Sequence, residues 1–377
     1  MTVVVAPLLD TYPRAAVTFV EGDGVWLTDA RGRRYLDFCA GIAVVGLGHG
    51  HPAPLAAARA QLDRLWHVSN LYWTEPMAAL AGRLSDRFGG AQAFFCNSGA
   101  EAVEAALKYA RKATGRPGVL ALDGSFHGRT LGALSVTGQP AKRHAFEPLL
   151  PGAAFARLND VESLHAAATA ETGCILLEPV QGEGGIRLAS PAFLAAAVHL
   201  AAELGALLCL DEVQTGVGRT GTFFAFEQLG IRPQLVTLAK SLANGLPIGC
   251  LLVADEVTGA FEPGDHASTF GGNPVVCAAA CAVCDAVDDE LLADVQATGA
   301  QLVRGLEHLP GVLSARGRGL LVGAELDRPA APVVAACLEA GLLVSAAGET
   351  VLRLTPPLVA GPDEVAQALF ILEEVLS

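Results

Sequence analysis

The sequence has few aromatic residues, few charges and very few lysines. Aromatic residues make up 6% of the 377 residues and charged residues 17%, whereas hydrophobic residues make up 52%. A chain of this composition can bury a large core, which excludes intrinsic disorder, and its length is typical of about two domains. The net charge of −14 argues against nucleic-acid and membrane partners, because nucleic acids and anionic membranes are themselves negative. A small anionic substrate stays open, since it responds only to local charge.

The cysteines exclude further classes of protein. The nine cysteines lack the paired spacing of a secreted disulfide scaffold and no secretory leader is recognisable, so we expect a cytoplasmic protein. Cys277, Cys281 and Cys284 have the spacing of some iron–sulfur sites. The same spacing places them on one face of a helix, with only Ala and Val between them. We interpret them as small core residues and expect no metal site.

One stretch, 192–210, resembles a membrane-spanning helix in its length and apolar character. It contains His199, Glu203 and Gly205, and Asp211 follows it directly. We therefore expect a buried helix that ends near Gly205, followed by a buried strand, and no membrane partner.

The pattern of apolar residues and turns along the chain changes near residue 54. Residues 17–38 alternate apolar runs with glycine-containing turns, which predicts a small antiparallel sheet. Beyond them, helices alternate with short apolar strands, which predicts an α/β fold with a mostly parallel central sheet and helices on both faces. We expect a large domain at 54–290, a smaller α+β domain at 291–377, and an N-terminal segment, 1–53, that packs with the smaller domain. The predicted helices include Ala78–Phe88, Ala100–Ala113, Pro191–Leu204 and Val275–Val287, and the predicted strands include Ala93–Cys96, Gly118–Leu122, Cys174–Glu178, Ala206–Asp211, Leu235–Ala239, Val312–Ala315, Leu320–Glu325 and Leu352–Leu354.

Four lysines occur in the whole chain. Lys108 and Lys112 lie four residues apart and predict a solvated helix face, and Lys142 lies in a polar loop. Lys240 ends the apolar strand 235–239 and precedes a turn rich in Gly and Pro. Open α/β sheets bind ligands at the carboxyl ends of their strands, and burial there makes an amine nucleophilic by lowering its pKa. Lys240 is therefore a candidate nucleophile, with a snorkelling lysine as the alternative.

Asp211 ends another apolar strand. Alone, it is equally compatible with a metal ligand, a helix cap or the partner of a buried cation. Together with Lys240, it suggests a site for a cofactor that contains a pyridine ring. A carboxylate that faces a pyridine nitrogen keeps the nitrogen protonated, and a protonated pyridine ring is an electron sink for carbanions.

Residues 94–101 read as a strand, a turn and the start of a helix. The free backbone N–H groups at a helix start, with Ser98 beside them and Gly99 allowing close approach, can hold a phosphate. The segment is neither a Walker loop, which needs Gly-Lys followed by Ser or Thr, nor the dinucleotide fingerprint, which needs Gly-x-Gly-x-x-Gly. An ordinary helix cap by Asn97 or Ser98 is the alternative.

Further loops and a late strand carry candidates for ligand contacts. Phe126 follows a predicted strand, where an aromatic ring can stack on a flat cofactor, and Arg129 can hold a carboxylate. His127 is a candidate base, although a loop histidine is more often structural. Arg353 lies in a late apolar strand and needs a partner if it points inward, for which Glu183 or an incoming carboxylate would serve.

Six motifs occur in order and at the spacing of a known family. Together they resemble the class III pyridoxal-phosphate aminotransferases of fold type I and, within that class, are similar to the acetylornithine aminotransferases. The resemblance runs from about residue 12 to the C-terminus. The motifs are NSGAEAVEAALKYAR, FHGRT, LLEPVQGEGG, LDEVQTGVGRTG, TLAKSLANGLPIG and STFGGNP.

The resemblance implies a role for each candidate residue. Lys240 would hold pyridoxal 5′-phosphate as a Schiff base, and Asp211 would pair with the ring nitrogen. Gln214 would lie near the phenolic oxygen, and Phe126 would stack on the ring. The remaining implied contacts are Ser98, Gly99 and Ala100 to the phosphate, Thr269 to the phosphate in the neighbouring subunit, Arg129 and Ser268 to the acylornithine, Arg353 to the α-carboxylate of glutamate, and Glu183 to Arg353 when glutamate is absent.

The resemblance also implies a homodimer and a reaction. N-acetylornithine and 2-oxoglutarate would give N-acetylglutamate semialdehyde and glutamate, a step of arginine biosynthesis, by a ping-pong mechanism with Lys240 as general acid and base. Ala100 and Val103 depart from the family, in which many members have Thr and Asn there, and this leaves the exact substrate open. Same-fold alternatives are transfer from ornithine, 4-aminobutyrate, succinyldiaminopimelate or a carrier-linked lysine precursor, or an aminomutase. An alternative from another class is a non-catalytic protein that binds a phosphate ligand.

Overall fold

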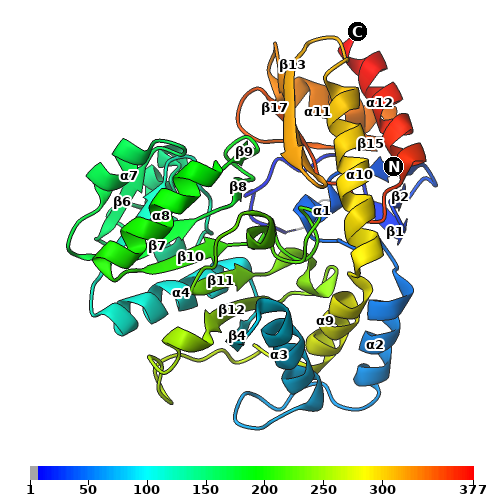
Figure 1. Cartoon of the computed structure of the whole chain (residues 1–377). Helices are drawn as coiled ribbons and strands as arrows, with labels where there is room; N and C mark the ends of the chain where they lie inside the picture. Colours follow the sequence, from blue (N-terminus) through cyan, green and yellow to red (C-terminus); the bar gives the residue numbers. More distant parts are fainter. Residues whose placement is uncertain (1–6) are drawn as a thin grey trace.

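A seven-stranded sheet lies at the centre of the computed structural model, which describes residues 7–377 (Figure 1). Its strand order is β4-β12-β11-β10-β7-β5-β6, and β12 alone runs antiparallel to its neighbours. The prediction of a mostly parallel central sheet is confirmed. The strands are β4 (Ala91–Cys96), β5 (Gly118–Leu122), β6 (Ala153–Ala156), β7 (Thr172–Leu177), β10 (Leu207–Asp211), β11 (Leu235–Leu238) and β12 (Gly249–Ala254).

Helices cover both faces of this sheet, because alternate residues of each strand point to opposite sides. Leu208 and Leu210 of β10 join one core, with α3, α8 and α9. Leu207 and Cys209 of the same strand join a second core, with α4. The helices of this part are α1 (Ala40–Ala43), α2 (Pro52–Leu62), α3 (Glu75–Phe88), α4 (Gly99–Thr114), α5 (Leu131–Ser135), α6 (Pro140–Arg143), α7 (Val161–Ala167), α8 (Pro191–Leu204) and α9 (Pro274–Ala286), with the 3₁₀ helices η1 (His144–Phe146), η2 (Ala225–Gln228), η3 (Lys240–Ala243) and η4 (Asp255–Val257).

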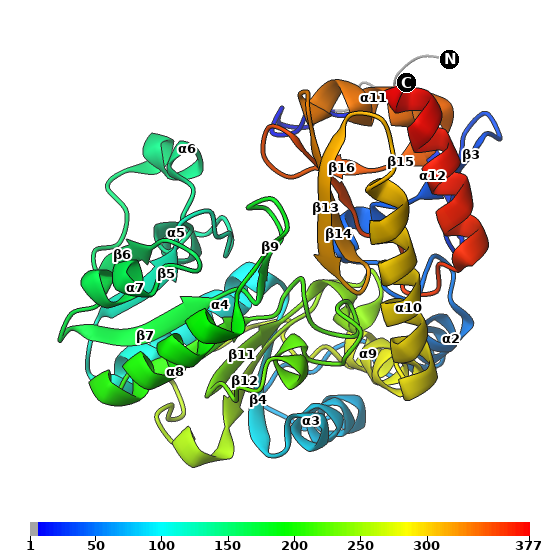
Figure 2. The ribbon, with the colours of Figure 1, turned by 45° about the horizontal axis from the view of Figure 1, so that its top comes forward.

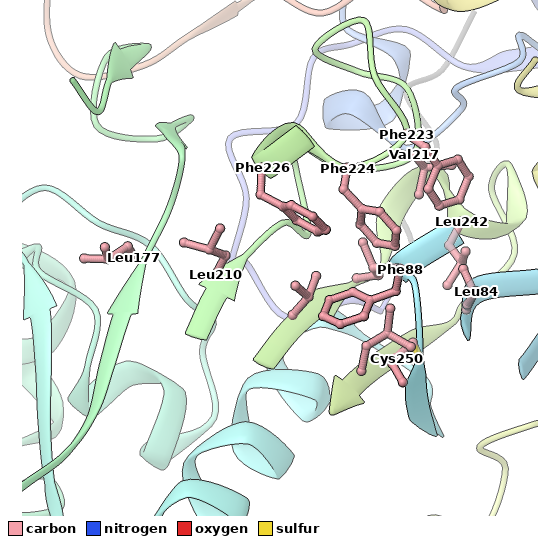
Figure 3. Packing of buried hydrophobic residues seen from close by; sticks show 14 of the residues in the cluster. Leu84, Phe88, Leu177, Leu210, Val217, Phe223, Phe224, Phe226, Leu242 and Cys250 are labelled. Atoms are coloured by element: carbon pink, nitrogen blue, oxygen red, sulfur yellow. The ribbon is translucent and has the colours of Figure 1, made fainter. Parts of the chain in front are cut away.

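An aromatic cluster fills part of the first core (Figure 3). The ring of Phe226 stacks on Phe224 with centroids 5.1 Å apart, and the ring of Phe88 meets Phe226 edge-on at 5.6 Å. The buried carboxyl of Glu212 accepts hydrogen bonds from the backbone N–H groups of Ala225 and Phe226, at 2.6 and 2.9 Å. The segment that follows β10 is thus fixed by packing and by hydrogen bonds.

The predicted elements of the large sheet are all present, with ends that shift by a few residues. The apolar stretch 192–210 is α8 followed by β10, with Gly205 at φ 60° between them, as predicted. Within residues 7–377 no helix combines the length and the apolar character needed to cross a membrane. The strands β6 and β12 were not predicted. β12 is antiparallel because the turn after β11 is too short for the crossover that a parallel strand requires.

The N-terminal strands join the C-terminal part of the chain. The strand β3 pairs in parallel with β15, with Leu36 opposite Leu342, and Leu36 and Phe38 share a core with α10, α11 and α12. Figures 1 and 2 show this part beside the large sheet, with α10 reaching toward α9. The division at residues 53 and 290 stays a prediction, and residues 1–6 lie outside the described chain. The remaining elements are β1 (Phe19–Asp23), β2 (Trp26–Asp29), β3 (Arg34–Asp37), β8 (Val180–Gln181), β9 (Arg187–Leu188), α10 (Asp289–Leu306), β13 (Val312–Arg318), β14 (Leu321–Leu326), α11 (Ala330–Ala340), β15 (Leu342–Leu343), β16 (Ser345–Ala346), β17 (Val351–Leu354) and α12 (Pro362–Leu376).

The three closely spaced cysteines lie on α9. Cys277 and Cys284 are buried in the first core, and the half-buried Cys281 packs against it. Their interpretation as core residues is confirmed. Within residues 7–377 no three His, Cys, Asp or Glu side chains are grouped so that they could hold a metal ion.

Candidate active site

The candidate site is a cavity of about 430 Å³ at the carboxyl ends of the parallel strands. The strand β10 ends at Asp211, and Lys240 follows β11 after one residue. Parallel strands end at the same edge of a sheet, so both side chains line the cavity. Other lining residues include Asn97, Ser98, Gly99, Ala100, Phe126, His127, Arg129, Glu178, Glu183, Val213 and Gln214.

Lys240 has an unusual backbone and an unusual amine. Its φ is 43°, a left-handed conformation that non-glycine residues seldom adopt and that occurs often at functional sites. Burial, together with the positive charge of Arg353, lowers the pKa of Lys240 to about 8. A larger fraction of the amine is therefore unprotonated near neutral pH than in an exposed lysine. This property suits a nucleophile and a proton-transfer group.

Asp211 is held by three hydrogen bonds and is 4% exposed. Its Oδ2 lies 2.7 Å from His127 Nδ1, and its Oδ1 accepts from Thr237 Oγ1 at 3.1 Å and from the Val213 N–H at 3.0 Å. Burial acts to lower the pKa of His127, but the hydrogen bond and the charge of Asp211 outweigh it and the pKa is raised. We call Asp211, His127, Thr237 and the neighbouring Glu178 the buried acid cluster.

Glu178 follows β7 and connects two loops of the cavity. Its Oε1 accepts a hydrogen bond from the Phe126 N–H at 2.8 Å, and its Oε2 accepts one from the Gly182 N–H at 3.3 Å. Burial, reinforced by the charge of Asp211 and opposed by that of His127, raises the pKa of Glu178 to about 7. The carboxyl thus holds the backbone of Phe126, whose ring lines the cavity.

The start of α4 combines a helix cap with a possible phosphate cradle. Ser98 Oγ accepts from the Glu101 N–H at 3.2 Å, so Ser98 is the N-cap. The N–H groups of Gly99 and Ala100 belong to the first turn and have no partner within the helix, and both residues line the cavity. A Cβ on Gly99 would lie 2.7 Å from a methyl carbon of Val213, so this position requires glycine. The helix cap is confirmed, and the phosphate-binding role of this turn stays a prediction.

A second group of charges is centred on Glu183, which also lines the cavity. Arg353 of β17 is buried and donates from Nη1 to Glu183 Oε1 at 2.5 Å and to the Gly182 carbonyl at 3.3 Å, and from Nε to Ser345 Oγ at 3.1 Å. Lys142 Nζ lies 3.9 Å from Glu183 Oε2. Burial acts to raise the pKa of Glu183, but Arg353 outweighs it and the pKa is lowered. We call Glu183, Arg353 and Lys142 the carboxylate gate.

Not every predicted site residue lies in the cavity. Arg129 lines it but is exposed, with its guanidinium 5.6 Å from the centre of the Phe126 ring. Ser268 and Thr269 are not among the lining residues of the single chain. Ser268 Oγ accepts a hydrogen bond from the side chain of Asn97, which does line the cavity, at 3.2 Å, whereas Thr269 is exposed.

Sequence reasoning assigned no site role to three residues of these two groups. His127 was named as a candidate base with a structural role favoured, whereas Glu178 was named only as the end of a predicted strand. Thr237 becomes visible through strand register, because it lies opposite Asp211 in the pairing of β10 with β11. Lys142 was assigned to a polar loop, and no local pattern links it to Glu183.

Residues 216–221 form a glycine-rich segment outside the cavity lining. It has the Gly-x-Gly-x-x-Gly spacing of a dinucleotide-binding turn, which sequence reasoning overlooked. Such a turn leads directly into an α-helix, but the next helix here is the short 3₁₀ helix η2. Arg219 within the segment is fully buried and donates to the carbonyls of Leu320 at 3.0 Å and Pro356 at 2.5 Å. The segment connects two parts of the chain and does not form a dinucleotide site.

The chemistry of the cavity fits pyridoxal phosphate. An aldehyde needs an amine of lowered pKa, which Lys240 provides, and a phosphate needs a helix start such as that of α4. A ring nitrogen needs a carboxylate, which Asp211 provides. Gln214 Oε1 is buried without a hydrogen-bond partner in the described chain and is available to a polar ligand group. The fold and the site thus define an α/β enzyme that binds an aldehyde cofactor through a lysine.

Comparison with known proteins gives the family. Residues 10–376 match the family described as aminotransferase class-III, and the chain belongs to it. The acetylornithine aminotransferase of Gloeobacter violaceus is 48% identical over 98% of this chain and 96% of its own length. That of Aquifex aeolicus is 43% identical over 98% and 99%.

Solved structures agree with this assignment. The ornithine aminotransferase of Toxoplasma gondii superposes with a TM-score of 0.93 at 31% identity, covering 98% of this chain and 92% of that one. The N-acetylornithine aminotransferase of Stenotrophomonas maltophilia has a TM-score of 0.84 at 36% identity, covering 97% and 96%. The chain is therefore an aminotransferase of fold type I that uses pyridoxal phosphate.

Proposed function

We propose that the protein transfers the terminal amino group of N-acetylornithine to 2-oxoglutarate, giving N-acetylglutamate semialdehyde and glutamate, a step of arginine biosynthesis. The observation that carries the proposal is one cavity lined by Lys240, Asp211 and Glu183, with Arg353 paired to Glu183. Relatives named acetylornithine aminotransferase, 43% to 48% identical over nearly the whole chain, support this choice of donor.

The chemistry at the cofactor end is assigned to Lys240 and Asp211. Bound pyridoxal phosphate supplies an electron-withdrawing ring that stabilises the charge left when a neighbouring carbon loses its proton. Lys240 would hold the cofactor covalently, and its amine, freed when the donor amine binds, would move the proton that the donor carbon loses. Asp211, hydrogen-bonded to His127, would pair with the ring nitrogen. Gln214 would lie near the ring oxygen, Phe126 would stack on the ring, and Ser98, Gly99 and Ala100 would hold the phosphate.

The carboxylate gate addresses a problem of two substrates. The acylornithine reacts at a carbon far from its α-carboxylate, whereas glutamate reacts at the carbon next to it. Two arginines at different places solve this problem: Arg129 and Ser268 bind the acylornithine, and Arg353 binds the α-carboxylate of glutamate. Glu183 covers Arg353 during the first half-reaction, so that the acylornithine carboxylate is not drawn to the wrong arginine.

We also propose that the active form is a homodimer. Large apolar side chains are exposed on the single chain within residues 66–73 and at Phe270, and an apolar surface of this kind is typical of a protein interface. Thr269 is exposed next to one of them, which suits its proposed contact with the phosphate in the neighbouring subunit. The exposed side chains are Trp66 (66%), Leu71 (84%), Tyr72 (68%), Trp73 (87%) and Phe270 (62%).

Compartment and domains complete the proposal. All nine cysteines are free, which supports a reducing cytoplasm. The pairing of β3 with β15 supports the assignment of residues up to 53 to the smaller domain at 291–377, beside the large domain at 54–290.

The test is a spectrum and a donor panel. Purified protein with pyridoxal phosphate should show a visible absorption band that glutamate removes, and Lys240→Ala should lack it. N-acetylornithine should give a kcat/KM at least about tenfold above ornithine, 4-aminobutyrate and succinyldiaminopimelate. A higher value with another donor refutes the proposed substrate, and the lack of any band with wild-type protein refutes the proposed chemistry.

A further inference from the structure

The carboxylate gate contains one cation more than the proposed function requires. Glu183 lies between two positive groups: Oε1 contacts Arg353 Nη1 at 2.5 Å, and Oε2 is 3.9 Å from Lys142 Nζ. The distance to Lys142 is too long for a hydrogen bond, so in this structure Glu183 is paired with Arg353. A small rotation of the Glu183 side chain would bring it to Lys142.

The surroundings show which member of the gate can move. The Arg353 side chain is 3% exposed and is anchored by Ser345 and by the Gly182 carbonyl. The Glu183 side chain is 26% exposed and lies in the turn between β8 and β9. Within the described residues its ion-pair contacts are to Arg353 and Lys142 alone. Figure 2 shows this turn between α6, which carries Lys142, and the sheet that contains β17. When a substrate carboxylate takes Arg353, Glu183 is the group that must leave.

Lys142 lies beside Phe126, whose ring lines the cavity. Its Nζ donates to Gln139 Oε1 at 2.5 Å and lies 4.9 Å from the centre of the Phe126 ring. Gln139 is itself fixed by donating to the carbonyls of Gly124 and Ser125, at 3.1 and 3.2 Å. An ammonium group has three protons to donate, so Lys142 keeps donors for a carboxylate. The pKa of this lysine is lowered by burial, and the charge of Glu183 acts in the opposite direction.

We propose that Lys142 is a positioning residue that receives the Glu183 carboxylate when the α-carboxylate of 2-oxoglutarate or glutamate displaces it from Arg353. This inference rests on the proposed function of the gate and extends it. A displaced carboxylate without a partner in a half-buried site would cost free energy, and that cost would weaken binding of the dicarboxylate substrate. Lys142 removes the cost in one half-reaction only, because Glu183 stays on Arg353 while the acylornithine reacts.

The test separates the two half-reactions of the holoenzyme in Lys142→Gln. The KM for 2-oxoglutarate should rise about three- to tenfold, the range expected for loss of a partly exposed ion pair in a charge-assisted contact. The KM for the amino donor and both maximal rates should change less than about twofold. Binding of glutarate, a dicarboxylate that cannot react, should weaken by the same factor in calorimetry. Lys142→Arg should keep values close to wild type, and Arg157→Gln, which breaks a surface ion pair with Asp160, should change nothing.

A double-mutant cycle decides what Lys142 touches. In a Glu183→Gln background the Lys142→Gln change should have no further effect on the KM for 2-oxoglutarate, because the group that Lys142 receives is gone. A persistent effect would show that Lys142 binds the substrate itself and would overturn the proposal. An unchanged KM, or an equal rise for both substrates, would also overturn it. If wild-type protein transferred no amino group from any donor, the proposed function would fail first, and glutarate calorimetry would still decide for or against Lys142.

Discussion

The buried acid cluster and the carboxylate gate both contribute side chains to the cavity, but they differ in burial and in hydrogen bonding. In the cluster, Asp211 is 4% exposed and each of its oxygens has a partner from the sheet or from the loop that bears His127. In the gate, the Glu183 side chain is 26% exposed and is shared by two cations from distant parts of the chain. The cluster has one arrangement available, whereas the gate has two.

This difference matches the chemistry on each side. A cofactor ring that stays bound through every turnover needs a fixed charge, and low exposure with full hydrogen bonding fixes it. Two substrates that alternate in one cavity need a charge that can be covered and uncovered, and a half-exposed glutamate between two cations provides it. Changes to the cluster should therefore affect every substrate alike, and changes to the gate should affect one substrate at a time.

The largest effect is expected from Asp211→Asn. Removing a preorganised charge from an active site costs on the order of 10²–10³-fold in rate, and both half-reactions should slow equally. The amide keeps the shape of the side chain, so the fold should persist. Single-turnover rates with each substrate measure the effect, with Asp160→Asn as a surface control. A loss confined to one half-reaction would break the distinction between cluster and gate.

Glu178 should make stability depend on pH. The pKa of this carboxyl is raised from an ordinary 4.5 to about 7, so the fold favours its neutral form. The stabilising contribution is fully present below the unfolded pKa and is lost as pH rises through about 7. The loss amounts to about 3 kcal/mol for a shift of this size. Chemical denaturation at fixed protein concentration should show this decline for wild type and a flatter profile for Glu178→Gln. Parallel profiles would mean that Glu178 titrates normally.

Arg353→Gln should separate the substrates. A hydrogen bond to a charged group contributes about 1.5–3 kcal/mol, so the KM for 2-oxoglutarate should rise about 10–100-fold. The KM for N-acetylornithine should change far less, because Glu183 covers Arg353 in that half-reaction. Steady-state kinetics with each substrate varied in turn measure both values. Equal rises would show that Arg353 serves both substrates.

Glu183→Gln should have the smallest effect, and it should act on the other substrate, N-acetylornithine. Without its negative partner Arg353 is uncovered at rest and draws the α-carboxylate of the acylornithine to the wrong place. The KM for N-acetylornithine should rise by about three- to tenfold, comparable with the loss of one exposed or half-exposed ion pair, and the KM for 2-oxoglutarate should not rise. A rise for 2-oxoglutarate alone would contradict the covering role of Glu183.

The sequence predicts the cluster end of the site better than the gate. Lys240 and Asp211 end apolar strands, and strand ends converge in any parallel sheet, so their meeting follows from the pattern. Thr237 depends on register, which appears only when β10 and β11 are paired. The direction of β12 depends on the length of one turn.

The full set of gate residues could not be predicted from local sequence patterns, for a different reason. Arg353 and Glu183 were paired as an inward arginine and an acidic loop, but Lys142 lies on a four-residue helix in a loop whose path no periodicity predicts. Ser268 and Thr269 do not line the cavity of the single chain, and the contact proposed for Thr269 would need a second subunit.

The central claim is that Lys240 carries the cofactor, and reductive trapping tests it most directly. Borohydride fixes an imine bond between a lysine and an aldehyde, and the chain has only Lys108, Lys112, Lys142 and Lys240 to choose from. After reduction of the holoenzyme, peptide mass spectrometry should find the pyridoxyl phosphate mass on the peptide that contains Lys240, and Lys240→Ala should lose it. A label on another lysine, or no label on wild-type protein, would contradict the account.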